Sequence, residues 1–314
     1  MQFYDFKEIE ERVILIGVQT EQDEDVAASL DELEELAATA GAVTVGKVIQ
    51  NREAVHPGTY IGKGKIEEVA ALLAAYDANG VICDDELSPA QMNNLERELD
   101  CKVMDRTLLI LDIFAGRATT SEGKIQVELA QLRYRSARLV GLRESLSRLG
   151  GGIGTRGPGE KKLETDRRLI RTRISALKAE LAQVEKHREL IRGKRSRGNL
   201  KTAAIVGYTN AGKSTLLNTL TGAGILAEDK LFATLDPTTR VLELKDGQQI
   251  LLTDTVGFIR KLPHHLVEAF KSTLEEAKYA DYIIHVVDAS NPQAELQMHT
   301  VYETLRELGA TGKK

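Results

Sequence analysis

The chain has 314 residues, of which 42% are hydrophobic and 28% are charged, and its formal net charge is -5. This composition excludes a wholly disordered chain, and the length predicts two or three domains. No apolar run approaches the roughly 20 residues that span a bilayer, and the acidic start resembles neither a secretory signal nor a transit peptide. The two cysteines, Cys83 and Cys101, form no disulfide framework, so we expect a cytoplasmic protein with reduced thiols.

The charge is strongly segregated along the chain. Residues 1–116 carry 9 basic and 24 acidic side chains, residues 117–201 carry 22 and 9, and residues 202–314 carry 11 and 14, which sum to 42 and 47. The middle block is therefore strongly basic within a modestly acidic protein. Such a block favours a polyanionic partner, while the acidic first block disfavours indiscriminate binding to it.

The first block predicts a small α/β domain over residues 1–116. Short apolar runs, each long enough for a buried strand, alternate with patterns of helical period. The predicted strands cover 13–18, 42–49, 80–83 and 101–104. The predicted helices are a stretch from Val26 that Gly41 ends, residues 65–76, and a helix that starts at Ser88-Pro89 with Gln91 at the capping-box position. This βαβα order predicts parallel strands.

The middle block predicts an antiparallel helical hairpin over residues 117–198. One long helix covers about 122–146, and a second covers about 164–191. In the second helix, apolar residues step by 3, 4 and 3, as in a coiled-coil seam: Ile174, Leu177, Leu181 and Val184. Residues 150–160 form a glycine-rich loop at the tip, and Gly193–Gly198 is a basic linker that marks a domain boundary.

The last block, residues 199–314, predicts a second α/β domain with a mostly parallel, doubly wound sheet. Predicted strands cover 202–206, 241–244, 250–253 and 282–287, with helical patterns between or after them. The first strand runs directly into the glycine-rich motif Gly207-Tyr208-Thr209-Asn210-Ala211-Gly212-Lys213-Ser214.

This motif fits G-x-x-x-x-G-K-[ST] at every position. Its glycines let backbone N–H groups surround a phosphate chain, and the predicted helix 214–220 adds the positive end of its dipole. Lys213 neutralises the β- and γ-phosphates, and the Ser214 hydroxyl is placed to bind Mg²⁺. A turn that binds nothing is the alternative, and the strand before the motif and the helix after it argue against that alternative.

Two further segments complete a nucleotide site. Asp254-Thr255-Val256-Gly257 follows a strand, so Asp254 can reach the ligands of Mg²⁺ and the Gly257 N–H can reach a γ-phosphate. Between the two motifs, residues 231–240 form a Thr-rich loop in which a switch threonine is expected to close on Mg²⁺. From the residues alone, Thr234, Thr238 and Thr239 are all candidates.

Together, GYTNAGKS, FATLDPTTR and DTVGF resemble the motifs of the Obg–HflX superfamily of GTPases. The glycine-rich stretch 150–160 and the LETDRR that follows at 163–168 closely resemble the signature loop of the HflX family, and IGKGK at 61–65 fits that family's N-terminal domain. The resemblance extends from about residue 12 to the end of the chain. It implies a cytoplasmic, monomeric GTPase that binds the large ribosomal subunit and its RNA, and that dissociates stalled or hibernating ribosomes in stress.

The resemblance also implies a set of site residues. Thr234 is the switch threonine, and Lys213, Thr234 and Gly257 serve the hydrolysis of GTP. Ser214 and Thr234 bind Mg²⁺, and Asp254 supports the ligands of the ion. The residues expected to bind GTP are Gly207, Tyr208, Thr209, Asn210, Ala211, Gly212, Lys213, Ser214, Thr215, Phe232, Ala233, Thr234, Leu235, Asp236, Asp254, Thr255, Val256 and Gly257.

Two departures qualify this expectation. No NKxD motif occurs before Lys314, so guanine selectivity rests on the resemblance, and we expect a G domain whose C-terminal part is missing. Phe258 follows the DxxG motif where Ras-like enzymes place a water-orienting glutamine, so we expect slow intrinsic hydrolysis that ribosomes stimulate.

The basic hairpin predicts contact with RNA, because arginine suits phosphate forks and stacking on bases. The candidates near the glycine-rich tip are Arg148, Arg156, Lys161, Lys162, Arg167 and Arg168. The alternative is a flexible loop between solvated helices. Two other functions stay open from the residues: an ATPase or unspecific NTPase acting on RNA, and a non-enzymatic RNA-binding fragment.

Overall fold

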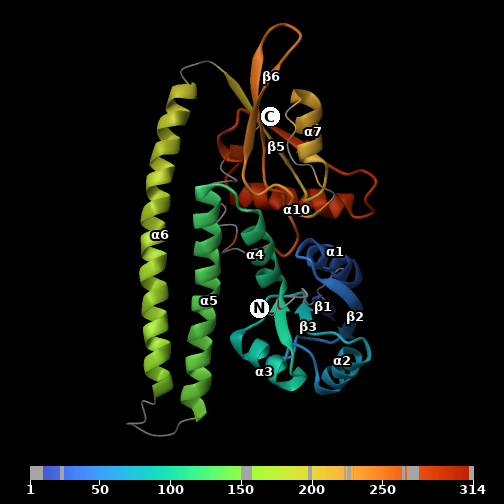
Figure 1. Cartoon of the computed structure of the whole chain (residues 1–314). Coiled ribbons are helices and arrows are strands. Elements are labelled where there is room, and N and C mark those ends of the chain that lie inside the picture. The colour runs from blue at the N-terminus through green and yellow to red at the C-terminus, as the bar shows by residue number, and fades with distance from the viewer. Residues whose placement is uncertain are drawn as a thin grey trace, which may run out of the picture. The chain divides into compact units, whose positions relative to one another are not determined.

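The computed structural model describes residues 10–21, 25–149, 158–196, 200–222, 224, 228, 230–263, 266 and 276–310 (Figure 1). The chain divides into two compact units. The first comprises Met1–Asp112 with Ala137–Leu163, and the second comprises Ile113–Ser136 with Glu164–Lys314. Each unit contains one four-stranded sheet.

The sheet of the first unit has the order β2-β1-β3-β4, and all its paired strands are parallel. Its strands are β1 (Arg12–Gln19), β2 (Val43–Asn51), β3 (Gly80–Cys83) and β4 (Lys102–Asp105). Its helices include α1 (Val26–Thr39), α2 (Lys63–Ala75) and α3 (Pro89–Leu99). The predicted alternation of strands and helices in this block is confirmed.

The apolar run in β1 is buried because both faces of the sheet are covered. Ile14 and Ile16 belong to a core cluster with residues of α2 and α3, and Leu15, which points to the other face, is also fully buried. Helix α1 packs on β1 and β2. Cys83 is buried and Cys101 is half-buried, and both are free thiols.

Helix α3 begins with the predicted capping box. Ser88 Oγ accepts a hydrogen bond from the Gln91 N–H at 3.3 Å, and Gln91 Oε1 accepts one from the Ser88 N–H at 2.9 Å. The sequence analysis missed α4 (Arg106–Arg117), which follows β4 without a connecting turn. Its apolar run lacks a helical period because most of its side chains are buried, while the Asp105 carboxylate accepts from the Leu108 N–H at 2.8 Å and starts the helix.

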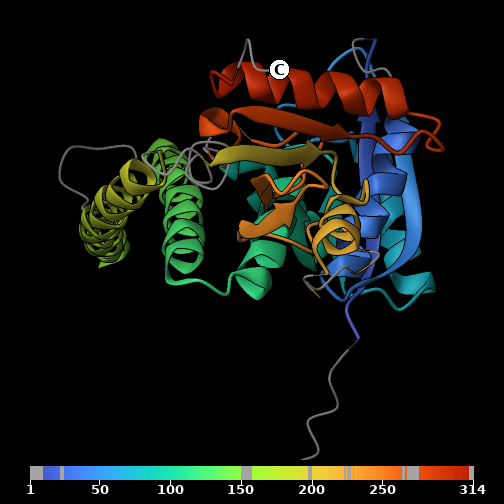
Figure 2. The same ribbon diagram turned by 90° about the horizontal axis from the view of Figure 1, so that it is seen from above.

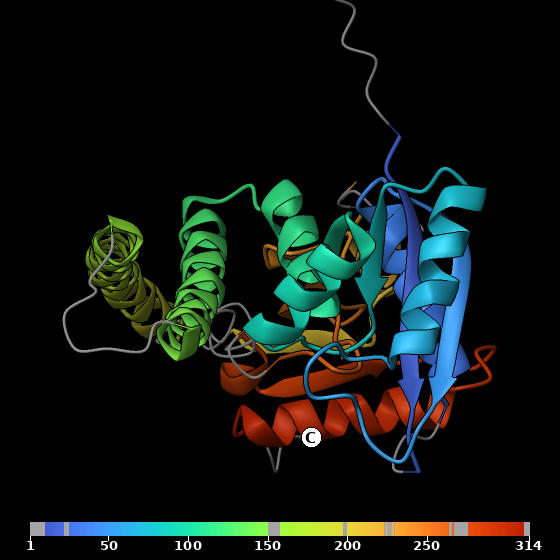
Figure 3. The same cartoon turned by 90° about the horizontal axis from the view of Figure 1, so that it is seen from below.

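The predicted hairpin is confirmed as α5 (Ser121–Leu149) and α6 (Pro158–Ser196), which lie side by side in Figures 1 and 3. Two ion pairs join the helices in antiparallel register: Glu128 with Arg173, and Glu122 with Arg188. On the predicted seam Leu177 is buried and its three partners are half-buried.

Helix α6 is longer than predicted at both ends. Proline at the first position and acidic Glu160 in the first turn favour the earlier start. The prediction that Gly193–Gly198 is a linker is wrong for its first part, because the helix continues to Ser196. Lysine and arginine are good helix formers and are favoured in the last turn, which accounts for the extension.

The sheet of the second unit has the order β6-β7-β5-β8. Its strands are β5 (Lys201–Gly207), β6 (Thr238–Glu243), β7 (Gln249–Asp254) and β8 (Tyr282–Val286). Strand β5 is parallel to β7 and β8, and β6 is antiparallel to β7, so the predicted mostly parallel sheet is confirmed. Figure 2 shows β8 and β5 between α10 (Ala294–Glu307) and α7 (Lys213–Thr221).

The two helices of this sheet complete a small core. Helix α7 packs on β5, β6 and β7, and α10 packs on β5. Ala203, Ile205, Leu217 and Leu252 form the buried cluster between α7 and the sheet. Across the described parts of the chain, none of the helices combines the length and the apolar character that crossing a bilayer requires.

Candidate nucleotide site

The glycine-rich motif forms the loop between β5 and α7. Strand β5 ends at Gly207, and α7 begins at Lys213 with Gly212 at its N-cap. Gly212 has a φ of 90°, a left-handed conformation that glycine adopts without steric cost. The first N–H groups of α7 have no acceptor within the helix, so the loop leads the chain into an anion-binding helix start.

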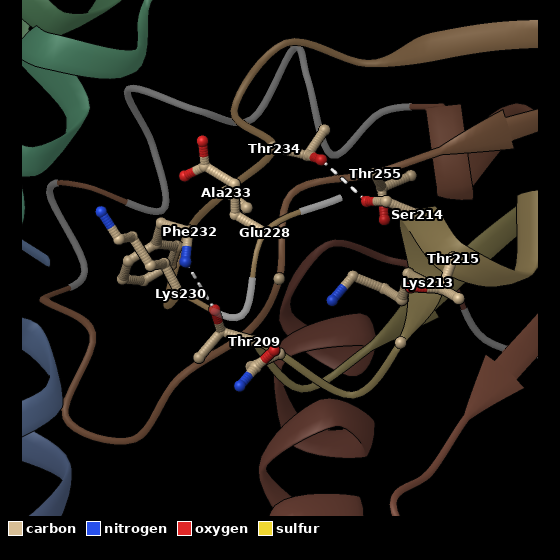
Figure 4. A pocket seen from close by; sticks show the side chains of 13 residues that line it. Thr209, Lys213, Ser214, Thr215, Glu228, Lys230, Phe232, Ala233, Thr234 and Thr255 are labelled. Atoms are coloured by element: carbon tan, nitrogen blue, oxygen red, sulfur yellow. Dashed lines mark hydrogen bonds between the residues drawn. The ribbon is translucent and has the colours of Figure 1, made fainter. Parts of the chain in front are cut away.

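A pocket of about 390 Å³ lies over this loop (Figure 4). Its lining comes from the loop and α7, from the segment before β6, and from the segment after β7. The lining residues are Thr209, Asn210, Gly212, Lys213, Ser214, Thr215, Glu228, Lys230, Phe232, Ala233, Thr234, Thr255 and Gly257. The structure thus brings together residues of the three motifs that the sequence analysis singled out.

Two lining residues, Glu228 and Lys230, were not predicted from the sequence. They lie in the connection after α7 and belong to no recognisable motif. Only their distance of a few residues from the Thr-rich loop could have drawn attention to them.

Three oxygen-bearing side chains meet beside the pocket, and two of them, Ser214 and Thr234, line it. Ser214 Oγ donates to Asp254 Oδ2 at 2.6 Å, and it lies 2.8 Å from Thr234 Oγ1 (Figure 4 marks the latter contact). Asp254 is fully buried, and burial raises the pKa of its carboxyl against the opposing effects of Ser214 and Lys213. Its second oxygen, Oδ1, is buried and has no hydrogen-bond partner among the residues that the structure describes.

This group of side chains fits a magnesium ion. Mg²⁺ prefers oxygen ligands and usually combines one or two protein ligands with water and substrate phosphates. The hydroxyls of Ser214 and Thr234 are adjacent, and the unpartnered Asp254 Oδ1 needs a donor, which a water of the ion would supply. The three residues predicted to serve a metal therefore lie together and have the right chemistry.

Lys213 is held at the floor of the site. Its ammonium donates to the Tyr208 carbonyl oxygen at 2.6 Å, and only 6% of the residue is exposed. Burial lowers the pKa of Lys213 to about 8, although the charge of Asp254 acts in the opposite direction. A phosphate chain in the pocket would give this buried cation an anionic partner.

Gly257 also contributes through the absence of a side chain. A Cβ atom at this position would lie 2.5 Å from Thr209 Cα and 3.0 Å from Lys213 Nζ. The segment after β7 can therefore approach the loop closely only with glycine here, which places the Gly257 backbone at the pocket.

The segment from Lys230 to Pro237, which we call the switch loop, closes over the site. The Phe232 N–H donates to Thr209 Oγ1 at 2.7 Å, and Phe232 adopts a left-handed φ of 55°. A bulky residue rarely adopts this conformation, so the surrounding contacts must hold it there. Of the candidate threonines, Thr234 lies at the pocket, while Thr238 and Thr239 lie in β6.

Several residues of the predicted GTP-binding set do not line the pocket. Tyr208, Leu235 and Val256 are buried in the packing beneath it, and Gly207 and Ala211 contribute backbone to the loop. The carboxylate of Asp236 is bound instead by Thr119 and Thr120. Phe258 is also buried, with its N–H bonded to the Gly207 carbonyl at 3.1 Å.

The predicted RNA contacts are partly described. Arg168 is exposed on α6, and Arg167 is half-buried with Glu164 4.0 Å away. The backbone of Arg148 lies in α5, and that of Lys161 and Lys162 lies in α6. The side chains of these three residues, and all of Arg156, lie outside the described residues.

Models of known families match three consecutive parts of the chain. Residues 27–115 match the N-terminal region of a GTP-binding GTPase family, and residues 117–195 match its middle region. Residues 202–313 match a family described as 50S ribosome-binding GTPases.

Similar proteins cover nearly the whole chain. "GTPase HflX" of Lacrimispora saccharolytica is 74% identical over 309 residues, which is 98% of this chain and 73% of that protein. "GTPase HflX" of Escherichia coli is 49% identical, over 96% of this chain and 70% of that protein. A GDP complex of SsGBP has a TM-score of 0.54 at 28% identity, covering 96% of this chain and 80% of that one.

Proposed function

Because the chain belongs to the HflX family of GTPases, we propose that it binds GTP with Mg²⁺, hydrolyses it, and acts on the large ribosomal subunit in the cytoplasm. We infer further that it acts as a monomer and dissociates stalled or hibernating ribosomes under stress. In this proposal residues 1–116 and 117–198 engage the ribosome, and residues 199–314 are the G domain.

The observation that carries the nucleotide part is the meeting of Ser214, Thr234 and Asp254 beside the glycine-rich loop. In the proposal the backbone of the loop surrounds the phosphates, and Lys213 neutralises them. The hydroxyls of Ser214 and Thr234 bind Mg²⁺, and Asp254 accepts from the ligands of the ion. When bound, the ion neutralises charge on the β- and γ-phosphates.

Hydrolysis by the chain alone is proposed to be slow. The residue after the DxxG motif is Phe258, whose side chain is 1% exposed and has no group that could hydrogen-bond a water. A partner must therefore help to orient the attacking water. The rate of hydrolysis is therefore expected to rise when ribosomes are present.

The ribosomal part rests on charge and on the family description. The hairpin block is basic, and the model that matches the G domain describes 50S ribosome-binding GTPases. Exposed arginines such as Arg168 suit the phosphates of RNA. The proposed role of the hairpin is thus to bring an RNA-binding surface to the large subunit.

Co-sedimentation with purified large ribosomal subunits tests the proposal. The 314-residue chain is incubated with a non-hydrolysable GTP analogue, with GDP, or without nucleotide, across a range of salt concentrations. We expect pelleting that requires the analogue and weakens with salt. Pelleting that does not depend on the nucleotide would indicate an RNA-binding module. Absence of pelleting at low salt would contradict the ribosomal role.

Two arginine variants test whether the hairpin makes the contact. Arg168→Ala is expected to weaken pelleting and to reduce the slope of log affinity against log salt by about one for one lost phosphate contact. The control is Arg173→Ala on the same helix, because Arg173 is bound by both oxygens of Glu128 at 2.7 and 2.8 Å. An equal change of slope in both variants would argue against a specific surface.

The nucleotide preference needs its own measurement. Competition of ATP against GTP for the pocket, with release of phosphate as the second readout, separates the proposed GTPase from an unspecific NTPase. We expect GTP to bind to the pocket more tightly than ATP, and we expect release of phosphate to require Mg²⁺.

A further inference from the structure

The switch loop is held from two sides within the second unit. On its inner side, Phe232 and Thr234 bond to the glycine-rich loop and α7 through Thr209 and Ser214. On its outer side it contacts residues 114–123, which comprise the end of α4 and the start of α5. Nothing in the proposed function assigns a role to these outer contacts.

The strongest outer contact is the carboxylate of Asp236. Its Oδ2 accepts from the Thr119 N–H at 2.9 Å, the Thr119 hydroxyl at 2.7 Å and the Thr120 N–H at 2.9 Å. Its Oδ1 accepts from the Thr120 hydroxyl at 2.6 Å. Although burial acts in the opposite direction, these bonds hold the pKa of Asp236 below its usual range.

The carboxylate also lies at the start of α5. Thr120 Oγ1 accepts from the Gly123 N–H at 2.9 Å, so Thr120 caps the helix. Asp236 adds a second cap from a distant part of the chain, where the helix dipole favours a negative charge.

Gly123 makes room for this arrangement. A Cβ atom at Gly123 would lie 2.4 Å from Asp236 Oδ1, a distance that no relaxed structure allows. Gly123 lies in the first turn of a regular helix, where alanine is otherwise the better residue. The presence of glycine at position 123 is therefore explained by the nearby Asp236 carboxylate and not by a requirement of the helix.

Two weaker contacts flank the carboxylate. The rings of Phe114 and Phe232 pack edge to face, with centroids 4.7 Å apart. Arg117 pairs with Glu228 of the pocket at 2.8 Å. The left-handed Phe232 is thus fixed by the Thr209 hydroxyl on one side and by Phe114 on the other.

We propose that Asp236, seated on Thr119, Thr120 and Gly123 at the start of α5, is the positioning residue that holds Thr234 over the nucleotide pocket. The inference rests on the proposed function. Only Leu235 lies between Thr234 and Asp236, so their Cα atoms are at most about 7 Å apart, and the bonds that hold Asp236 restrict the backbone position of Thr234. The start of α5 and the γ-phosphate side of the pocket are thereby coupled.

The test substitutes Gly123→Ala in the 314-residue chain, with Gly116→Ala as control. Gly116 lies in α4, and no heavy atom of the described residues lies within 4 Å of where its added Cβ would be. Both substitutions raise helix propensity, but only the first displaces Asp236. A second variant, Asp236→Asn, keeps the size of the side chain and removes its charge.

The first readout needs no nucleotide. We expect amide hydrogen exchange at Phe232, on the far side of the switch loop from the substitution, to become about tenfold faster in Gly123→Ala and Asp236→Asn, which corresponds to one lost hydrogen bond to a charged group. Gly116→Ala should leave it unchanged. Unchanged exchange at Phe232 in both variants would overturn the proposal, whether or not the chain binds nucleotide.

The second readout is the preference for a non-hydrolysable GTP analogue over GDP in the presence of Mg²⁺. We expect this preference to fall about tenfold and kcat to fall with it, while the affinity for GDP stays near that of the wild type. Thr119→Ser should retain the preference, and Thr119→Val should lose part of it. Equal losses of affinity for GDP and the analogue would indicate a merely structural contact and overturn the inference. A wild-type chain that binds neither nucleotide would contradict the proposed function instead.

Discussion

The two sheets of the molecule both place aspartates at the carboxyl ends of parallel strands, but they treat these aspartates differently. In the first sheet Asp84 follows β3 and Asp105 ends β4. In the second sheet Asp254 ends β7. All three are fully buried.

In the first sheet protein groups satisfy the carboxylates. Arg106 Nη2 donates to Asp84 Oδ1 at 2.8 Å, and Ser29 Oγ donates to Asp84 Oδ2 at 2.8 Å. Asp105 accepts from the Leu87 and Leu108 N–H groups, and Arg138 pairs with it at 2.5 Å. These aspartates join strands to helices, and each of their carboxylates is bonded to protein groups.

In the second sheet the same kind of residue is left incomplete. Asp254 Oδ2 is bonded to Ser214, while in the described part of the chain its Oδ1 is buried without a hydrogen-bond partner. The nearby Lys213 ammonium is buried against a carbonyl oxygen. An aspartate at the end of a strand can therefore have a structural or a functional role. What distinguishes the two roles is whether protein groups bond to both of its carboxylate oxygens.

The largest effect is expected when a paired carboxylate of the first sheet loses its partner. Arg106→Met leaves the Asp84 charge buried and uncompensated, which should lower the free energy of unfolding by about 3–5 kcal/mol. The measurement is amide hydrogen exchange in β1 and β3, which should become on the order of a hundredfold faster or more.

The control for this prediction is an arginine on the surface of the same unit. Arg97 on α3 has a side chain that is 73% exposed, so Arg97→Ala should change stability by no more than about 0.5 kcal/mol. If Arg106→Met exchanged as slowly as the wild type, the carboxylates of the first sheet would not be structural, and the comparison would fail.

In the second sheet, loss of a buried aspartate charge is expected to change the free energy of unfolding less, and in the opposite direction. Asp254→Asn removes a buried charge that lacks a full set of partners, so stability should stay the same or rise. The concentration of Mg²⁺ that supports half of the binding of a GTP analogue should rise about 10- to 100-fold. Titration with Mg²⁺ and thermal unfolding, measured on one preparation, give both numbers.

An exposed aspartate of the same sheet serves as the control. Asp246 lies in the turn between β6 and β7, and Asp246→Asn should alter neither the Mg²⁺ requirement nor stability. A loss of stability in Asp254→Asn comparable to that in Arg106→Met would show that Asp254 is structural like Asp84.

The site and the fold differ in how far the sequence predicts them. The glycine-rich motif and its flanking strand and helix are local, so their geometry follows from residue order. The meeting of Ser214, Thr234 and Asp254 could be expected, because three motifs of one site were recognised together. In contrast, the hydrogen bond between Thr119 and Asp236 joins residues 117 positions apart, and no local sequence pattern predicts it.

The missed helix α4 has a related cause. Its buried residues include Leu109, Ile110 and Phe114, and an element buried on most sides loses the period that identifies a helix. Glu228 and Lys230 were missed because only the folded loop brings them to the pocket. What the sequence analysis missed is thus tertiary in origin.

The smallest predicted effect distinguishes the buried cation of the second sheet from that of the first. Arg106 stays charged at any ordinary pH, but burial lowers the pKa of Lys213 from 10.5 to about 8. Phosphates in the pocket would raise it again, so nucleotide binding at pH 8 should take up about half a proton. Burial and the charge of Lys213 lower the pKa of the neighbouring His285, which keeps this imidazole neutral at that pH.

Calorimetry in two buffers of different ionisation enthalpy measures this uptake. As the pH rises from about 7 to 8.5 the protonated fraction of Lys213 falls, so affinity for nucleotide should decrease about fourfold. The sign follows from the direction of the shift, because the lowered pKa belongs to the empty pocket and the bound form prefers the ammonium. If no proton were taken up at pH 8 and the affinity for nucleotide did not change with pH, Lys213 would already be fully charged in the empty site. Burial would then leave Lys213 charged, as it leaves Arg106.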